Sequence, residues 1–180
     1  MMDARITSWI RELKRFNPQL HLMGPSMLEG IEGEVEVMLP LLESIHEMQI
    51  ADLGSGSGLP AIPFKILHPQ TEVLFIERST KKCTFLTHVV EILELTGVKI
   101  LSQDPLQVDT LRFDAVLARS FSPISTLEKV CRKTLRDGGR LYYLFTGKQP
   151  LLGEAFRLDD IMSEESRGHR INLAVFTRLP

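Results

Sequence analysis

Short apolar runs separated by longer stretches of helical periodicity organise most of this chain. Runs of the first kind occur at residues 49–53, 72–77, 98–102 and 113–118, and each is typical of a strand buried on both faces. Between the second and third runs, apolar residues recur at helical spacing from a cap at Ser79 and Thr80 to about Leu95, and Gly97 follows as a stop. Strands that alternate with helices favour a doubly wound α/β sheet.

The C-terminal part continues this pattern. Ser122-Pro123 is expected to open another helix, with Ser125-x-x-Glu128 as its capping box, and the turn at 137–139 is expected to end it. A strand at 141–145 should follow, and the alternation at 171–178 predicts a last strand at the edge of the sheet.

The N-terminal part reads differently. Residues 3–16 place five apolar side chains on one helical stripe, namely Ile6, Trp9, Ile10, Leu13 and Phe16. Arg11, Lys14 and Arg15 lie elsewhere on the helix, which is either a packing helix with a solvated face, the reading we favour, or an accessory that faces RNA. The glycines and prolines of residues 17–33 predict a loop or lid.

The strand at 49–53 runs into the pattern Asp52-x-Gly54-x-Gly56-x-Gly58. Glycines lack the Cβ atoms that would keep a ligand away from the backbone, and they tolerate positive φ, so such a turn is typical of a nucleotide site. The dinucleotide fingerprint needs a third glycine where this chain has Leu59. The spacing resembles motif I of the class I methyltransferases, which implies S-adenosyl-L-methionine. Another nucleotide ligand or a purely structural turn stays open.

Polar residues close the other predicted strands. Glu77 lies 19 positions after Gly58 (77 − 58), where an acid is expected to meet ribose hydroxyls, although a surface glutamate would look the same. Asp104, beyond the third strand, could recognise an adenine amino group. Arg119 ends the fourth strand and is our catalytic candidate, which would hold the cofactor or target near the methyl group; the alternative is an ion pair with Asp114 or Asp104.

A longer signature adds to the glycines. The run from Gly54 to Pro63 is similar to the G-x-G-x-G-L-P-G-I-P signature of the glucose-inhibited division protein B family, the bacterial small-subunit rRNA guanine N7-methyltransferases (RsmG). Further segments resemble that family at the right spacing: Lys81-Lys82-Cys83-Thr84-Phe85-Leu86, Ala118-Arg119-Ser120-Phe121, Gly147-x-x-Pro150 and Gly168-His169-Arg170.

The resemblance implies a Rossmann-like class I methyltransferase fold, with a mostly parallel seven-stranded sheet, an antiparallel last strand and an N-terminal helical extension. We expect one domain over 1–180, with the extension at 1–47 and the core at 48–180. The implied activity is methyl transfer from S-adenosylmethionine to N7 of a guanine in small-subunit rRNA. Its implied cofactor-binding residues are Asp52, Gly54, Gly56, Gly58, Leu59, Glu77, Asp104, Pro105 and Arg119.

Some positions depart from the family pattern. Residues 37–42 replace a run that holds a histidine and Asp-Ser-Leu, and Thr146 stands in place of a lysine, with Lys148 nearby. Gln103-Asp104-Pro105 replaces Arg-x-Glu. These changes affect the RNA substrate more than the cofactor. A methyltransferase acting on a small molecule or protein, or a non-catalytic paralogue that binds cofactor or RNA, therefore stays open as an alternative.

Charge and composition limit the partners. With 180 residues and 43% hydrophobic content the chain can bury one substantial core, but a net charge of −2 lacks the basic footprint of most nucleic-acid-binding proteins. A local phosphate-facing rim could still form, or these cations are simply solvated surface. The rim would comprise Lys81, Lys82, Arg132, Lys133, Arg136, Lys148, Arg167 and Arg170, of which Lys81, Lys82, Lys148 and Arg170 are our RNA-binding candidates.

The remaining chemistry is sparse. Cys83 and Cys131 are expected to be buried thiols, and the five histidines have no ligand spacing, so no metal is predicted. The sequence has neither an apolar run long enough to span a membrane nor a signal peptide, which predicts a cytoplasmic protein. We expect a monomer whose partner is small-subunit rRNA or its ribosomal particle.

Overall fold

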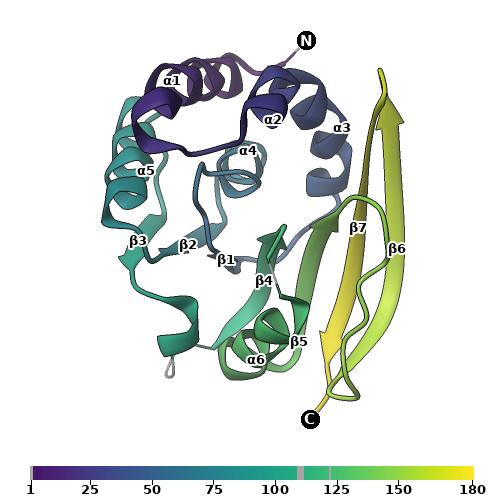
Figure 1. Cartoon of the computed structure of the whole chain (residues 1–180). Coiled ribbons are helices and arrows are strands. Elements are labelled where there is room, and N and C mark those ends of the chain that lie inside the picture. The colour runs from purple at the N-terminus through teal and green to yellow at the C-terminus, as the bar shows by residue number, and fades with distance from the viewer. Residues whose placement is uncertain (1, 109–111, 122) are drawn as a thin grey trace.

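The computed structural model describes residues 2–108, 112–121 and 123–180, and within them seven strands form one sheet in the order β3-β2-β1-β4-β5-β7-β6 (Figure 1). The strands are β1 (Gln49–Leu53), β2 (Glu72–Glu77), β3 (Val98–Ser102), β4 (Phe113–Arg119), β5 (Leu135–Phe145), β6 (Phe156–Ser166) and β7 (His169–Arg178). The helices are α1 (Ala4–Leu20), α2 (Pro25–Glu29), α3 (Ile31–Glu43), α4 (Ala61–Leu67), α5 (Thr80–Ile92) and α6 (Ile124–Thr134), with a 3₁₀ turn, η1 (Pro105–Gln107).

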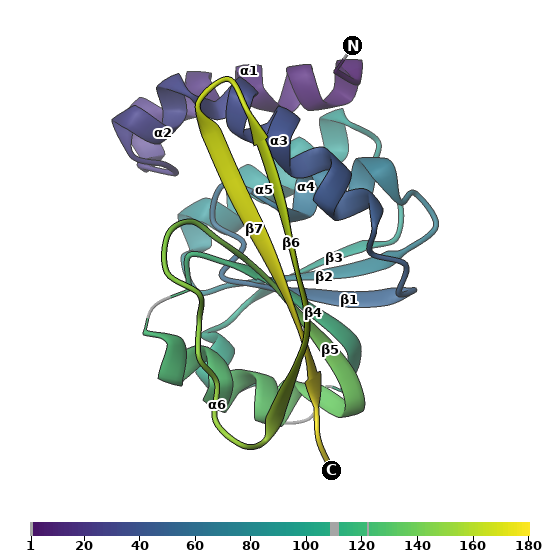
Figure 2. The same cartoon turned by 90° about the vertical axis from the view of Figure 1, so that its right-hand side faces the viewer.

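In β1 and β2, alternate residues are buried on opposite faces of the sheet. Ile50 and Phe75 belong to the core beneath α1, α3, α4 and α5, whereas their neighbours Ala51 and Ile76 belong to the core on the side of α6. Figure 2 shows these helices on the two sides of the sheet. The predicted doubly wound α/β fold is therefore confirmed, and so are the positions of the first four strands. The predicted burial is wrong for β3, whose residues are half-buried or exposed because it lies at the edge of the sheet.

The antiparallel last strand is confirmed, but its position is not at the edge. β7 pairs antiparallel with both β5 and β6, so β6 forms the edge and residues 171–178 lie inside the sheet. The sequence pattern did not indicate β6 because most of its side chains are polar and exposed.

Two predictions around α6 are wrong. Glu128 accepts a hydrogen bond from the Gly153 backbone N–H at 3.0 Å, and Pro123 occupies the N-cap, so Ser125-x-x-Glu128 is not a capping box. Ser122 lies outside the described residues. The helix ends at Thr134 instead of 137–139, because Leu135 already pairs with Phe113 of β4.

The prediction that the N-terminal helix is a packing helix is confirmed, because its apolar stripe is buried except for the half-buried Phe16. The loop predicted at 17–33 is wrong. α1 continues to Leu20, and Pro25 opens α2 at a position where proline loses no helical hydrogen bond. A Cβ on Gly30 or Gly33 would lie 2.8 or 2.7 Å from the His169 ring, so these glycines let α3 pack closely on β7. Among the described residues, no helix combines the length and apolar character needed to cross a membrane.

Candidate active site

The glycine-rich turn follows β1 at the carboxyl edge of the sheet. Gly54, Gly56 and Gly58 have φ values of +73°, +50° and +87°, which confirms that the turn uses the positive-φ freedom of glycine. A Cβ on Gly58 would also lie 2.5 Å from Cγ1 of Ile62. At this position glycine is required both by the backbone and by packing.

A cavity of about 280 Å³, here called the edge cavity, opens beside this turn. It brings together five of the predicted site residues, from the ends of β1, β2 and β4 and from the segment after β3: Gly54, Glu77, Asp104, Pro105 and Arg119. Sequence analysis gave no role to its other lining residues, which are Leu53, Arg78, Leu106, Ser120, Phe121 and Thr126. Ser120 and Phe121 could have been predicted as lining residues, because they belong to one of the segments that resemble the family.

Glu77 ties the cavity to the turn. Its Oε2 accepts a hydrogen bond from the Gly56 N–H at 3.0 Å, and its Oε1 accepts one from the Ser79 N–H at 2.8 Å. Cys83 is buried, as predicted, and its thiol lies 3.3 Å from the Glu77 carbonyl. The carboxylate thus fixes the turn and the start of α5 while it still lines the cavity.

Asp52 lies beneath the turn and does not line the cavity. Its side chain is buried, and Oδ2 has no hydrogen-bond partner among the described residues. Burial raises the pKa of this carboxyl to about 7, against a lowering by the Ser55 hydrogen bond, and the nearby Glu77 charge raises it further. A neutral or half-titrated acid therefore sits directly under the glycines.

Three other predicted residues act on the turn from within the protein. Gly56 contacts Glu77 through its N–H, Gly58 packs on Ile62, and Leu59 is buried in the core. The turn is also held from α1, because the indole N–H of the fully buried Trp9 donates to the Ser57 carbonyl at 3.0 Å. Their contact with a cofactor stays a prediction.

The ion-pair partner of Arg119 is neither Asp114 nor Asp104, the two acids proposed from the sequence. Nη2 of Arg119 forms an ion pair with Oε1 of Glu34 on α3, and its Nη1 lies 3.6 Å from Sδ of Met27 on α2. Asp114 binds Arg136 at 2.8 Å, and Asp104 accepts from the Leu106 N–H at 2.9 Å, so neither pairs with Arg119. Sequence reasoning missed Glu34 because the contact joins segments 85 residues apart.

The predicted basic rim divides between two edges of the sheet. Lys81 and Lys82 begin α5, while Lys148 follows β5 and Arg170 begins β7, which places all four at the carboxyl edge. The prediction that Arg132, Lys133 and Arg136 belong to this rim is wrong. These residues lie at the end of α6 and the start of β5, which are at the opposite edge of the sheet.

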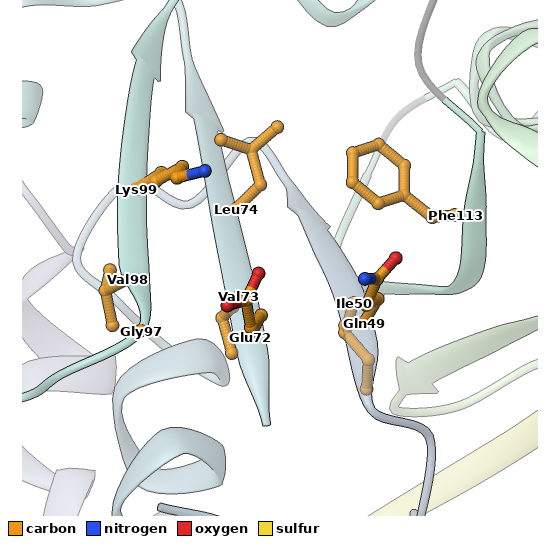
Figure 3. A pocket seen from close by; sticks show the side chains of 9 residues that line it. All are labelled: Gln49, Ile50, Glu72, Val73, Leu74, Gly97, Val98, Lys99 and Phe113. Atoms are coloured by element: carbon orange, nitrogen blue, oxygen red, sulfur yellow. The ribbon is translucent and has the colours of Figure 1, made fainter. Parts of the chain in front are cut away.

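Another cavity, of about 400 Å³, lies at that opposite edge (Figure 3). Gln49 and Glu72, the first residues of β1 and β2, line it together with Lys99 and Phe113. Parallel sheets bind ligands at the carboxyl ends of their strands, so this cavity is not the candidate active site. In the described part of the chain, no group of histidines, cysteines and acids could hold a metal ion.

The sheet order, the single antiparallel strand and the glycine turn at the carboxyl edge together define a class I methyltransferase fold. Solved structures agree on the fold. Magnesium protoporphyrin IX methyltransferase (ChlM) from Synechocystis, solved with bound SAM, is 14% identical with a TM-score of 0.64 over 99% of this chain and 98% of its own. TrmN from Thermus thermophilus is 19% identical with a TM-score of 0.59 over 81% of this chain and 48% of its own.

Sequence relatives are more specific. The family model described as rRNA small subunit methyltransferase G matches residues 2–162, and the chain belongs to that family. A protein of that name from Helicobacter pylori strain HPAG1 is 31% identical over 160 residues, which cover 85% of this chain and 86% of that protein. Ribosomal RNA small subunit methyltransferase G 3 from Bdellovibrio bacteriovorus is 30% identical over 79% of this chain and 67% of its own length.

Proposed function

We propose that this protein transfers the methyl group of S-adenosylmethionine to N7 of a guanine in small-subunit rRNA. The observation that carries the proposal is the family match over residues 2–162, which contains the glycine turn and every residue of the edge cavity. We further propose that it acts as a monomer in the cytoplasm, on the RNA or on its ribosomal particle.

The residues at the edge cavity suit this cofactor. Gly54 leaves its part of the cavity wall without a side chain, and Gly56 and Gly58 give the turn its positive-φ shape. Glu77 would offer carboxylate oxygens to the ribose hydroxyls, and Asp104 and Pro105 would hold the adenine. Asp52 would act on the cofactor only through the turn, since its side chain is buried and does not line the cavity. Bound there, the cofactor would supply an electrophilic methyl group on a sulfonium.

The protein has to orient the reactants more than activate them. Guanine N7 carries a lone pair outside the aromatic system, so no base must first remove a proton, and the displacement needs only an in-line approach. Holding two reactants in near-attack geometry lowers the barrier substantially. Arg119 would orient the target. Met27, whose sulfur lies 3.6 Å from Nη1 of Arg119, and Phe121, which lines the cavity, would help to exclude water from the reaction.

The RNA is expected to meet the carboxyl edge of the sheet. Lys81, Lys82, Lys148 and Arg170 would contact phosphates there, and such contacts give binding that weakens with added salt. Family membership does not favour a small-molecule or protein substrate. Calorimetry with S-adenosylmethionine tests the non-catalytic alternative, because a paralogue that binds only RNA would give no heat.

Mass spectrometry of rRNA from cells with and without the gene tests the proposal. We expect one 7-methylguanine of the small-subunit RNA to be missing in the deletion strain and restored by the cloned gene. An rRNA whose methylation is unchanged by the deletion would contradict the proposal.

A further inference from the structure

A second cavity adjoins the edge cavity on the side of α2 and α3. It has a volume of about 320 Å³ and is here called the adjoining cavity. Figure 2 shows α2 and α3 beside the end of the β6–β7 hairpin, and the cavity lies among these elements. The residues that line it include Ser26, Met27, Glu34, Thr146, His169 and Arg170.

One buried ion pair joins the two cavities. Arg119 lines the edge cavity and Glu34 lines the adjoining cavity, and their side chains are only 11% and 12% exposed. Met27, which also lines the adjoining cavity, touches Arg119 at 3.6 Å. A ligand in the adjoining cavity would therefore meet Glu34 first, then Arg119, then the contents of the edge cavity.

Glu34 has hydrogen-bonding capacity to spare. Arg119 occupies Oε1, and no other described side chain or N–H group bonds to Oε2. An ionised carboxylate is an acceptor only, with about four lone-pair sites. A buried carboxylate of this kind suits a ligand with two adjacent N–H donors.

Guanine presents its groups in the matching order. Around its perimeter come the N2 amino group and N1–H, both donors, then the acceptor O6, and then N7. A carboxylate fits the two donors and a guanidinium fits O6, which brings N7 toward whatever lies beyond the guanidinium. Enzymes that modify a base read it in this way, by hydrogen bonds to the Watson–Crick edge of an extruded nucleotide.

We propose that the adjoining cavity binds the target guanine, with Glu34 accepting from N1–H and N2–H and Arg119 donating to O6. The inference rests on the proposed function and deepens it, because it names the residue that selects the base. Adenine is rejected at both points, since its unprotonated N1 would face the carboxylate and its amino group would face the guanidinium. Arg170, exposed at the rim of the cavity, is placed to contact a flanking phosphate.

The test is a four-way comparison of nucleotide binding. Guanosine 5′-monophosphate and inosine 5′-monophosphate, which lacks only the N2 amino group, are titrated by NMR into the wild type and Glu34→Gln, each loaded with S-adenosylhomocysteine. We expect the wild type to prefer the guanine nucleotide about tenfold, as for a hydrogen bond to a charged group, and Glu34→Gln to lose that preference. Adenosine 5′-monophosphate should bind the wild type more weakly than either.

A merely structural role for Glu34 would leave the ratio of the two affinities unchanged, so an equal ratio in both proteins would overturn the proposal. The absence of any shift with the guanine nucleotide would overturn it too. Glu36→Gln is the matched control, because Glu36 is on the same helix but pairs with Arg167 at 3.2 Å and does not line the cavity. The rRNA methylation measured in cells fails only if the proposed function fails, which separates the two outcomes.

Discussion

Asp52, Arg119 and Gly56 show how single residues at this site combine fold and chemistry. Asp52 was predictable as a site residue from its place in the glycine motif. That its Oδ2 has no hydrogen-bond partner among the described residues was not predictable, because the desolvation of a side chain depends on the whole core around it. Arg119 was predictable from its place at a strand end. Its partner Glu34 was not, because it belongs to a helix that begins inside the segment predicted as a loop at residues 17–33. The sequence therefore predicted several of the residues that line the edge cavity. It did not predict the ion-pair partner of Arg119 or the raised pKa of Asp52.

Asp52 predicts a pH dependence of stability. Its folded pKa of about 7 lies above the ordinary value of 3.8, so its contribution to stability is complete below about pH 4 and is lost as the pH rises through 7. Between pH 5 and pH 8 the free energy of unfolding of the wild type should therefore fall by on the order of 2 kcal/mol relative to Asp52→Asn. Urea unfolding at both pH values measures this. Asp114→Asn, at an exposed ion pair, is the control, and parallel pH profiles for wild type and Asp52→Asn would refute the prediction.

Arg119→Lys should separate orientation from charge. Lysine keeps a cation beside Glu34 but lacks the planar fork of a guanidinium, so we expect kcat/KM for rRNA methylation to fall at least about tenfold while the free energy of unfolding changes by less than about 1 kcal/mol. Arg136→Lys, at the opposite edge, should leave activity unchanged. A loss of activity that merely tracks a loss of stability would mean that Arg119 serves the fold.

Gly56→Asp should abolish cofactor binding. The new carboxylate would stand beside Oε2 of Glu77, which lies 4.0 Å from the position of an added Cβ. Gly138→Asp is a matched control, because Gly138 also has positive φ but has nothing within 4 Å of an added Cβ. Calorimetry with S-adenosylmethionine should show wild-type affinity for the control and none for Gly56→Asp; equal affinities would place the cofactor elsewhere.

At the scale of elements, apolar pattern and turn chemistry identified the parts of the sheet that build the site. The buried strands β1, β2 and β4 were predictable because each is a short run of mostly apolar residues, and β3 was predictable from a similar run although none of its residues is fully buried. β6 was not, since an exposed edge strand has little hydrophobic pattern. α2 and α3 were hidden because Gly30 and Gly33 punctuate the chain, although their function is close packing on His169, a contact that no local pattern reveals.

α1 supports the glycine turn through one hydrogen bond, which gives an element-scale prediction. Trp9→Phe leaves the Ser57 carbonyl without its indole donor, and an unsatisfied buried acceptor costs about 1–3 kcal/mol. We expect that loss of stability together with a severalfold weaker affinity for S-adenosylmethionine. Ile10→Val trims the same helix face without touching the turn and should lower only stability. An unchanged cofactor affinity in Trp9→Phe would show that α1 does not support the site.

The whole molecule is acidic, with a net charge of −2, yet Lys81, Lys82, Lys148 and Arg170 all lie at the carboxyl edge of its sheet. Arg170 is 4.0 Å from its acidic partner, Glu165. The net charge alone argued against an RNA substrate, because it sums the charges at both edges of the sheet and hides the cations at the carboxyl edge. We predict that Lys148→Glu weakens binding to small-subunit rRNA and reduces the salt dependence of that binding, since each phosphate contact releases counterions. Lys129→Glu on α6 is the control, and filter binding at several salt concentrations compares them. Equal effects of the two variants would argue against an RNA-facing edge.

The most direct test of the account is methyl transfer by the purified protein. Small ribosomal particles from cells that lack the gene would be incubated with the protein and S-adenosylmethionine labelled on its methyl group, and the rRNA would be digested and analysed by mass spectrometry. The account predicts labelled 7-methylguanine at one position in the wild-type reaction and none with Gly56→Asp. Unlabelled RNA, or a label on any atom other than guanine N7, would contradict it.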